Sequence, residues 1–190
     1  IIERMRTYMV KVMTEEEFKK ILDKGETDTV EFKSWVKARN MKEIISLAVD
    51  ELIAFANSKG GTVYFGVEDN PVEVTGCNRN YDGQRMIEGI YDKTIPPLFS
   101  EISAFEYEGK LVIALSVKAD GKTYTTTDGR CLKRLGRNSK PAYPDELNNV
   151  YSSTQNPDFS ARIMSDSTLG DINKLEVYNL KEKLRVRDSK

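Results

Sequence analysis

Histidine is absent from all 190 positions of this sequence. Its absence excludes Ser-His and Cys-His nucleophilic centres, histidine-containing zinc sites and histidine general bases. Any acid, base or metal chemistry must therefore use Asp, Glu, Lys, Tyr or Cys side chains.

Cysteine and long apolar runs are also scarce. Cys77 and Cys131 are the only thiols and lack CxxC spacing, and the N-terminal stretch IIERMRTYMVKVM does not have the pattern of a signal peptide. We therefore expect reduced thiols and a cytoplasmic protein. No apolar run approaches ~18 residues, so no membrane span is predicted.

Charge is nearly balanced overall but uneven along the chain. The net charge of −1 provides no global attraction to a polyanion. The stretch RCLKRLGRNSK, however, holds five cations and no acid: Arg130, Lys133, Arg134, Arg137 and Lys140. These cations suit a phosphate backbone, and the nearby Tyr124 could stack on an unpaired base. The alternative is a soluble hairpin whose charges pair with acids elsewhere.

Helical and strand periodicities intermix along the chain. The pattern predicts helices at 14–24, 41–57, 81–95, 145–153 and 169–185, and strands at 29–34, 62–69, 101–107 and 110–118. Residues 72–77 could pair back as a hairpin, and 122–135 resembles a second hairpin that turns at Asp128-Gly129. The strand at 110–118 is apolar on both faces and is expected to be central. The fold class is therefore α+β, with a mixed, largely antiparallel sheet packed with helices.

The same pattern predicts four regions. These are an N-terminal extension at 1–13, a folded domain at 14–153, a polar linker at 154–167 and a helical region at 168–190. The apolar stripe of the last helix has nothing local to cover it. It docks back, pairs with another chain or begins a further region.

Gly60-Gly61 could cradle a phosphate, because backbone N–H groups in a tight turn attract anions. Phosphate-binding loops of the Walker and dinucleotide types run in the order strand, glycines, helix. Here the order is helix, glycines, strand. The glycines therefore indicate the end of a helix rather than a nucleotide site.

Four acids could form one wall of a site: Glu26, Glu31, Glu68 and Asp69. Alternation places Val30 and Phe32 on one face of a half-buried strand and Glu31 on its open face, with Lys33 beside it. If the strands at 29–34 and 62–69 are neighbours, these acids could hold a divalent cation that acts on a phosphodiester. The alternative is an ordinary solvated surface.

Four motifs in this order resemble the AlbA-like domain of Schlafen proteins: ETDTVEFK, AFANSKGGTVYFGVED, EVTGC and CLKRLGRNSKPA. The resemblance covers roughly residues 15 to 150. The E-F-K strand followed by A-F-A-N-x-x-G-G and G-V-x-D is its most specific part.

The resemblance implies a three-acid cleavage centre at Glu26, Glu31 and Asp69, with Mg²⁺ or Mn²⁺ bound by these acids, and structured RNA as substrate. Lys33 matches the family lysine and is expected to contact a phosphate. Schlafen nucleases combine two such domains, whereas this chain carries one copy. A complete groove would therefore need a second chain, which makes a homodimer one expectation.

Three functions follow as hypotheses. The first is a nucleic-acid-binding domain that is also a metal-dependent endoribonuclease, with the cations of 130–140 holding the backbone. The second is a non-catalytic DNA-binding module of a transcriptional regulator, as many bacterial relatives are described. The third is an interaction scaffold that self-associates through its last helix.

Overall fold

The computed structural model describes residues 13–143. These lie in the first of two units into which the chain divides, 1–151 and 152–190. The predicted linker, the helices at 145–153 and 169–185, and the extension before residue 13 lie outside the described residues. The elements are α1 (Glu15–Lys24), β1 (Val30–Lys33), α2 (Met41–Ala56), β2 (Gly61–Phe65), β3 (Val67–Asp69), β4 (Val72–Val74), α3 (Gly83–Asp92), β5 (Thr94–Ile95), β6 (Glu101–Tyr107), β7 (Lys110–Val117), β8 (Thr125–Thr126), β9 (Leu132–Leu135) and β10 (Asn138–Pro141).

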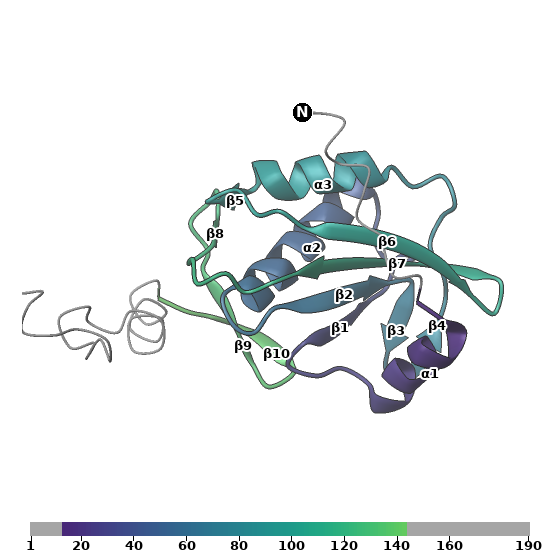
Figure 1. Cartoon of the computed structure of the whole chain (residues 1–190). Coiled ribbons are helices and arrows are strands. Elements are labelled where there is room, and N and C mark those ends of the chain that lie inside the picture. The colour runs from purple at the N-terminus through teal and green to yellow at the C-terminus, as the bar shows by residue number, and fades with distance from the viewer. Residues whose placement is uncertain (1–12, 144–190) are drawn as a thin grey trace, which may run out of the picture. The chain divides into compact units, whose positions relative to one another are not determined.

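A four-stranded sheet in the order β1-β2-β7-β6 forms the centre of this unit (Figure 1). β1 runs parallel to β2, and the other neighbours are antiparallel. The strands β3 and β4, β5 and β8, and β9 and β10 pair separately beside it. The α+β class with a mixed, largely antiparallel sheet is confirmed, as is the central place of β7.

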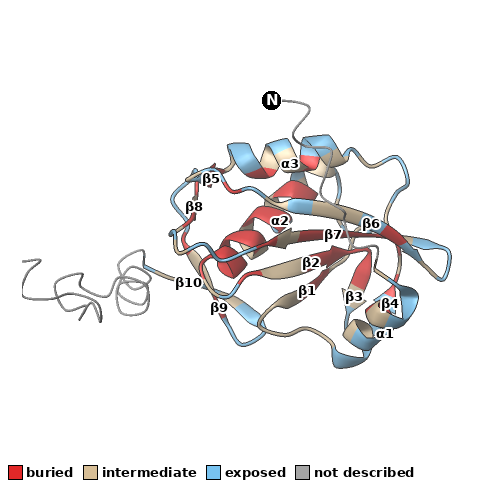
Figure 2. Cartoon of the chain, viewed as in Figure 1, coloured by how far each residue is buried: buried red, intermediate tan, exposed pale blue. Residues whose placement is uncertain are grey.

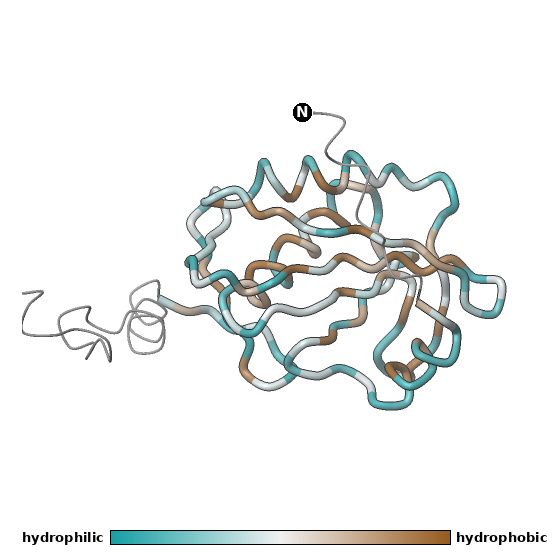
Figure 3. Tube along the Cα trace, viewed as in Figure 1, coloured by the Kyte–Doolittle hydropathy of each residue, from teal (hydrophilic) through white to brown (hydrophobic). Residues whose placement is uncertain are grey.

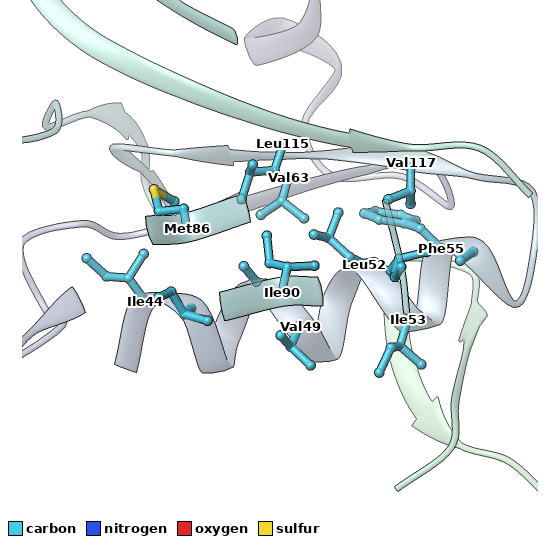
Figure 4. Close-up of a cluster of buried hydrophobic side chains, with 14 of the residues drawn as sticks. Ile44, Val49, Leu52, Ile53, Phe55, Val63, Met86, Ile90, Leu115 and Val117 are labelled. Carbon is cyan, nitrogen blue, oxygen red and sulfur yellow. The ribbon is translucent and has the colours of Figure 1, made fainter. Parts of the chain in front are cut away.

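Helices cover both faces of the sheet, so alternate residues of each strand join different apolar clusters. Helices α2 and α3 pack on Val63, Ile113 and Leu115, as Figure 4 shows in part. On the other face, Phe18 of α1 packs with Tyr64 and its neighbours. The buried positions accordingly concentrate in α2, β2 and β7 (Figure 2), and most of the hydrophobic colour follows them in Figure 3.

Local capping explains where the first two helices begin. Thr14 and Glu17 form the predicted capping box of α1, and the Asn40 side chain accepts a hydrogen bond from the Glu43 backbone N–H at the start of α2. At the other end of α2, a Cβ on Gly61 would lie 2.5 Å from the Phe55 ring and 2.7 Å from the Thr29 carbonyl oxygen. The glycine therefore serves close packing of helix against strand.

Two strand predictions were wrong in part. The stretch 62–69 is two strands, because Gly66 adopts φ +90° and breaks the alternation, so that Val67 joins the α1 side. The segment 72–77 does pair back, through β4 on β3.

The basic hairpin consists of β9 and β10 and turns at Gly136-Arg137. At Asp128-Gly129 there is only a tight turn, closed by a bridge between Thr125 and Cys131.

Two further expectations bear on the described residues. Cys77 and Cys131 are both free thiols, as predicted. Between residues 13 and 143, no helix has the length and apolar character needed to cross a membrane.

A buried charge cluster and an exposed basic hairpin

Two carboxylates and two cations form a closed ring between β1, α2 and β9, which we call the buried charge cluster: Glu31, Lys33, Glu51 and Arg134. The Arg134 Nη1 donates to Glu31 Oε2 at 2.9 Å and to Glu51 Oε2 at 3.1 Å. The Lys33 ammonium contacts Glu31 Oε1 and lies 3.0 Å from Glu51 Oε1. The four charges sum to zero, which is the condition under which burying them is tolerated.

Burial within this cluster is nearly complete at its centre. The Arg134 side chain is 2% exposed and that of Glu31 is 8% exposed. Burial lowers the pKa of Lys33, but Glu51 and Glu31 outweigh burial and raise this pKa above its ordinary value. Lys33 therefore stays charged inside the cluster.

Arg134 also ties the β9–β10 hairpin to the rest of the fold. Its Nη2 donates to the carbonyl oxygens of Thr27 and Arg137, each at 2.7 Å. Its guanidinium carbon lies 4.6 Å from the centre of the Phe55 ring, within the range of a cation–π contact. Ser139 of β10 accepts from Arg134 at 3.0 Å and donates to the Glu51 carboxylate.

The prediction that Glu31 faces open solvent was wrong. Phe32 does point to the α1 side, but the opposite face of β1 is covered by α2 and by the β9–β10 hairpin, so Glu31 is buried. Glu51 was not predicted as part of any site. The one signal in the sequence is its place one helical turn before Phe55, which puts the carboxylate beside the ring that Arg134 contacts.

The other three predicted acids lie outside this cluster, and Glu68 among them contacts Lys37. Glu26 Oε1 accepts a hydrogen bond from the Phe32 N–H at 3.0 Å, on the side of β1 away from β2. Burial raises the pKa of Glu26 to about 7, against the lowering effect of the Phe32 N–H, and the charges of Glu31 and Asp69 add to the rise. Asp69, the last residue of β3, is exposed. Glu26 is therefore within electrostatic reach of both Glu31 and Asp69.

These acids do not fit a divalent cation in the arrangement described. Glu31 is engaged through both oxygens, one with Lys33 and one with Arg134. Over residues 13–143, no group of three or more Asp, Glu or Cys side chains is placed to hold a metal ion.

The five predicted backbone-binding cations divide into different environments. Arg134 is buried, and Lys33, expected on a phosphate, lies in the same cluster. Arg130 lies 2.6 Å from Asp50 and 3.2 Å from Asp128. Lys133 is half-buried. Arg137 and Lys140 are exposed, and within the described part of the chain neither has an acidic partner.

Aromatic and apolar groups near the hairpin also differ from expectation. Tyr124, predicted to stack on a base, is buried and accepts and donates backbone hydrogen bonds with the Asn57 side chain. Leu135, beside the hairpin turn, is 65% exposed, and Tyr143, just after β10, is 75% exposed. Tyr143 therefore has the accessible ring that Tyr124 does not.

Comparison with known proteins agrees with this description. A family model described as Schlafen, AlbA_2 matches residues 26–143, more than half of the chain. The chain belongs to this family. The matched range begins at Glu26 and ends just after the β9–β10 hairpin, so it includes the whole buried charge cluster.

Two solved structures align with this chain, and the first of them shares its fold. The DIP2311 protein from Corynebacterium diphtheriae aligns with a TM-score of 0.61 and 22% identity over 87% of this chain. This chain covers 37% of the length of that protein. The N-terminal domain of a RecG-related protein from Nitrosomonas europaea aligns with a TM-score of 0.43 and 17% identity, over 68% of this chain and 90% of that domain.

Removing the Arg134 guanidinium should destabilise the fold strongly. In Arg134→Ala, Glu31 and Glu51 remain buried with one cation instead of two, and we expect the free energy of unfolding to fall by about 3–5 kcal/mol. Urea unfolding measures the change. The control is Arg137→Ala, an exposed arginine of the same hairpin, for which we expect a change within about 0.5 kcal/mol. Equal losses in the two variants would contradict the anchoring role.

Stability should depend on pH through Glu26. Its pKa is about 7 in the folded state against an ordinary value of 4.5, so between these values the folded state binds more protons than the unfolded state. The contribution of Glu26 is therefore complete below pH 4.5 and is lost as the pH rises through 7. Glu26→Gln keeps an oxygen for the Phe32 N–H but cannot titrate.

The measurement is urea unfolding of both proteins between pH 4.5 and 8. Relative to wild type, Glu26→Gln should gain stability as the pH rises. Glu101→Gln, the same change at an exposed site on β6, should follow the wild-type profile. Parallel pH profiles for wild type and Glu26→Gln would show that the Glu26 pKa is ordinary.

Proposed function

We propose that this chain binds nucleic acid through the exposed face of the β9–β10 hairpin. The proposal rests on a difference among the hairpin cations. Arg134 pairs with buried carboxylates, whereas Arg137 and Lys140 face solvent and have no acidic partner among residues 13–143. Cations that are not neutralised locally are available to phosphate oxygens. Membership of the Schlafen AlbA_2 family supports the same assignment.

The hairpin has further features that suit this partner. Anchoring by Arg134 holds the cations of a two-stranded ribbon in a fixed position, which lowers the ordering cost of binding. The exposed Leu135 and Tyr143 provide an apolar side chain and an aromatic ring next to the cations. Aromatic rings bind unpaired bases by stacking without regard to sequence.

Because the net charge is −1, attraction to a polyanion must come from this local surface rather than from the whole protein. Binding should consequently weaken steeply with salt. Structured RNA and duplex DNA both offer the required phosphates. If duplex DNA binds more tightly than tRNA, the domain acts as the DNA-binding module of a transcriptional regulator.

Removing the two exposed hairpin cations should weaken binding. For Arg137→Ala/Lys140→Ala we expect an affinity at least about tenfold lower at low salt. The slope of log K against log salt should be smaller by about 1.4–1.8, the value for two lost phosphate contacts. Fluorescence anisotropy with tRNA and with duplex DNA measures both quantities.

The matched control is Lys19→Ala/Lys20→Ala, which removes two exposed cations from α1, on the opposite face of the sheet. This variant has the same net charge as the hairpin variant and should bind like wild type. An equal loss in both double variants would mean that binding follows total charge, and the hairpin would then have no special role.

A second candidate function is endoribonuclease activity on structured RNA, with Mg²⁺ or Mn²⁺ and a homodimer supplying a complete groove. The observation that favours it is that Glu31 and Asp69 both lie close enough to Glu26 to raise its pKa. Against it stands the engagement of Glu31 with Lys33 and Arg134. Cleavage would therefore require this cluster to open.

This candidate is tested by incubating the protein with tRNA and Mn²⁺ and following the RNA by gel. We expect cleavage by wild type to be lost in Asp69→Asn, which changes an exposed acid outside the buried charge cluster and should fold normally. If wild type leaves the RNA intact, or if Asp69→Asn cleaves equally well, the assignment of a nuclease centre to these acids is wrong.

A further inference from the structure

A second cation-rich surface includes the connection from β1 to α2 and the first turn of α2. From Lys33 to Lys42 the sequence KSWVKARNMK holds four cations and no acid: Lys33, Lys37, Arg39 and Lys42. Lys33 is half-buried in the charge cluster, whereas the other three are exposed. Val36 among them is 65% exposed. We call residues 36–42 the basic loop.

The basic loop is held in place by its own hydrogen bonds. The Arg39 backbone N–H donates to Glu43 Oε2 at 2.9 Å, and the Asn40 side chain caps α2. The Lys37 side chain is 75% exposed and contacts Glu68, which is its only acidic partner among the described residues. The Glu68 side chain is only 13% exposed, so this pair is not fully solvated. The Lys37 ammonium itself lies at the surface, where a phosphate oxygen can reach it.

Contacts along the outer edge of β1 connect the basic loop to the hairpin. Lys37 contacts Glu68. The next residue, Asp69, raises the pKa of Glu26 through its charge, and Glu26 accepts a hydrogen bond from the Phe32 N–H. At the other end of this edge, the Thr27 carbonyl accepts from Arg134 of the hairpin. The two cationic surfaces thus lie at the two ends of one strand edge, with the acids between them.

Helix α2 sets the distance between these surfaces. The basic loop includes its N-cap, and the hairpin packs near its other end, where the Arg134 N–H donates to Ser58 Oγ at 2.9 Å (Figure 1). The helix has 16 residues and therefore rises about 24 Å. About seven base pairs at 3.4 Å each cover this length.

We infer that the basic loop is a second contact surface for the phosphate backbone of the nucleic acid that the hairpin binds. The inference rests on the proposed function and adds to it the extent of the partner: a nucleic acid that reaches from the hairpin to the basic loop, over a span of about seven base pairs, the length of α2. Phosphates near the two ends of this span contact the cations of the hairpin and of the basic loop. The acids between the two surfaces face the middle of the bound nucleic acid.

The test is binding of a duplex of about 20 base pairs, which exceeds this span, as RNA and as DNA. In Lys37→Ala/Arg39→Ala/Lys42→Ala the affinity should fall at least about tenfold, and the salt slope should be smaller by up to about 2.7. The control is Lys19→Ala/Lys20→Ala/Lys24→Ala on α1, which removes the same charge and should bind like wild type. Circular dichroism and thermal unfolding establish that each variant is folded.

The outcomes separate this inference from the proposed function. If the hairpin variant binds weakly but the basic-loop variant matches wild type in affinity and salt slope, the basic loop is not a contact surface, and the proposed function survives. If wild type does not bind either duplex or tRNA, both fall. If poly-glutamate binds wild type more tightly than the duplexes do and the basic-loop variant loses that binding, the surface serves an acidic protein and the inference is overturned.

Discussion

The arrangement of this domain depends on one buried guanidinium. Arg134 lies on the Phe55 ring between Glu31 and Glu51 and hydrogen-bonds backbone carbonyls on both sides. A short ribbon such as β9–β10 has few apolar side chains that can pack against the rest of the domain. Its Leu135 is exposed and does not add to this packing. Charge pairing therefore replaces apolar burial as the attachment of the hairpin. The acceptors are divided between the two terminal guanidinium nitrogens while the group lies on the Phe55 ring, a geometry that requires arginine rather than lysine.

Because Arg134 is buried, the β9–β10 hairpin carries two kinds of cation: one that stabilises the interior and others that lie on the surface. Arg134 and Lys33 neutralise the buried carboxylates, so Glu31 and Glu51 have a structural function in the domain as described. Four exposed cations have no acidic partner among residues 13–143 and are not needed to balance the interior: Arg137 and Lys140 of the hairpin, and Arg39 and Lys42 of the basic loop. A domain with a net charge of −1 can in this way present two local basic surfaces.

Local rules predicted much of the fold, and non-local contacts account for what was missed. The capping box at Thr14 and the doubly apolar β7 follow from spacing alone and were correct. Alternation placed Glu31 on the correct face of β1, but its burial could not be predicted from β1, because the groups that cover it, Glu51 and Arg134, come from other elements. Arg134 is 103 positions away along the chain. Similarly, an alternating pattern cannot reveal that Gly66 turns the chain and moves Val67 to the opposite cluster.

The central claim is that the anchored hairpin and its neighbouring strand edge form the nucleic-acid-binding face. The most direct measurement is an NMR titration of the ¹⁵N-labelled protein with tRNA or duplex DNA, read residue by residue. We predict the largest amide shift changes at 135–140 and 36–42, with little change in α1 and α3. Shift changes concentrated in α1 or α3, with the hairpin amides unmoved, would contradict it.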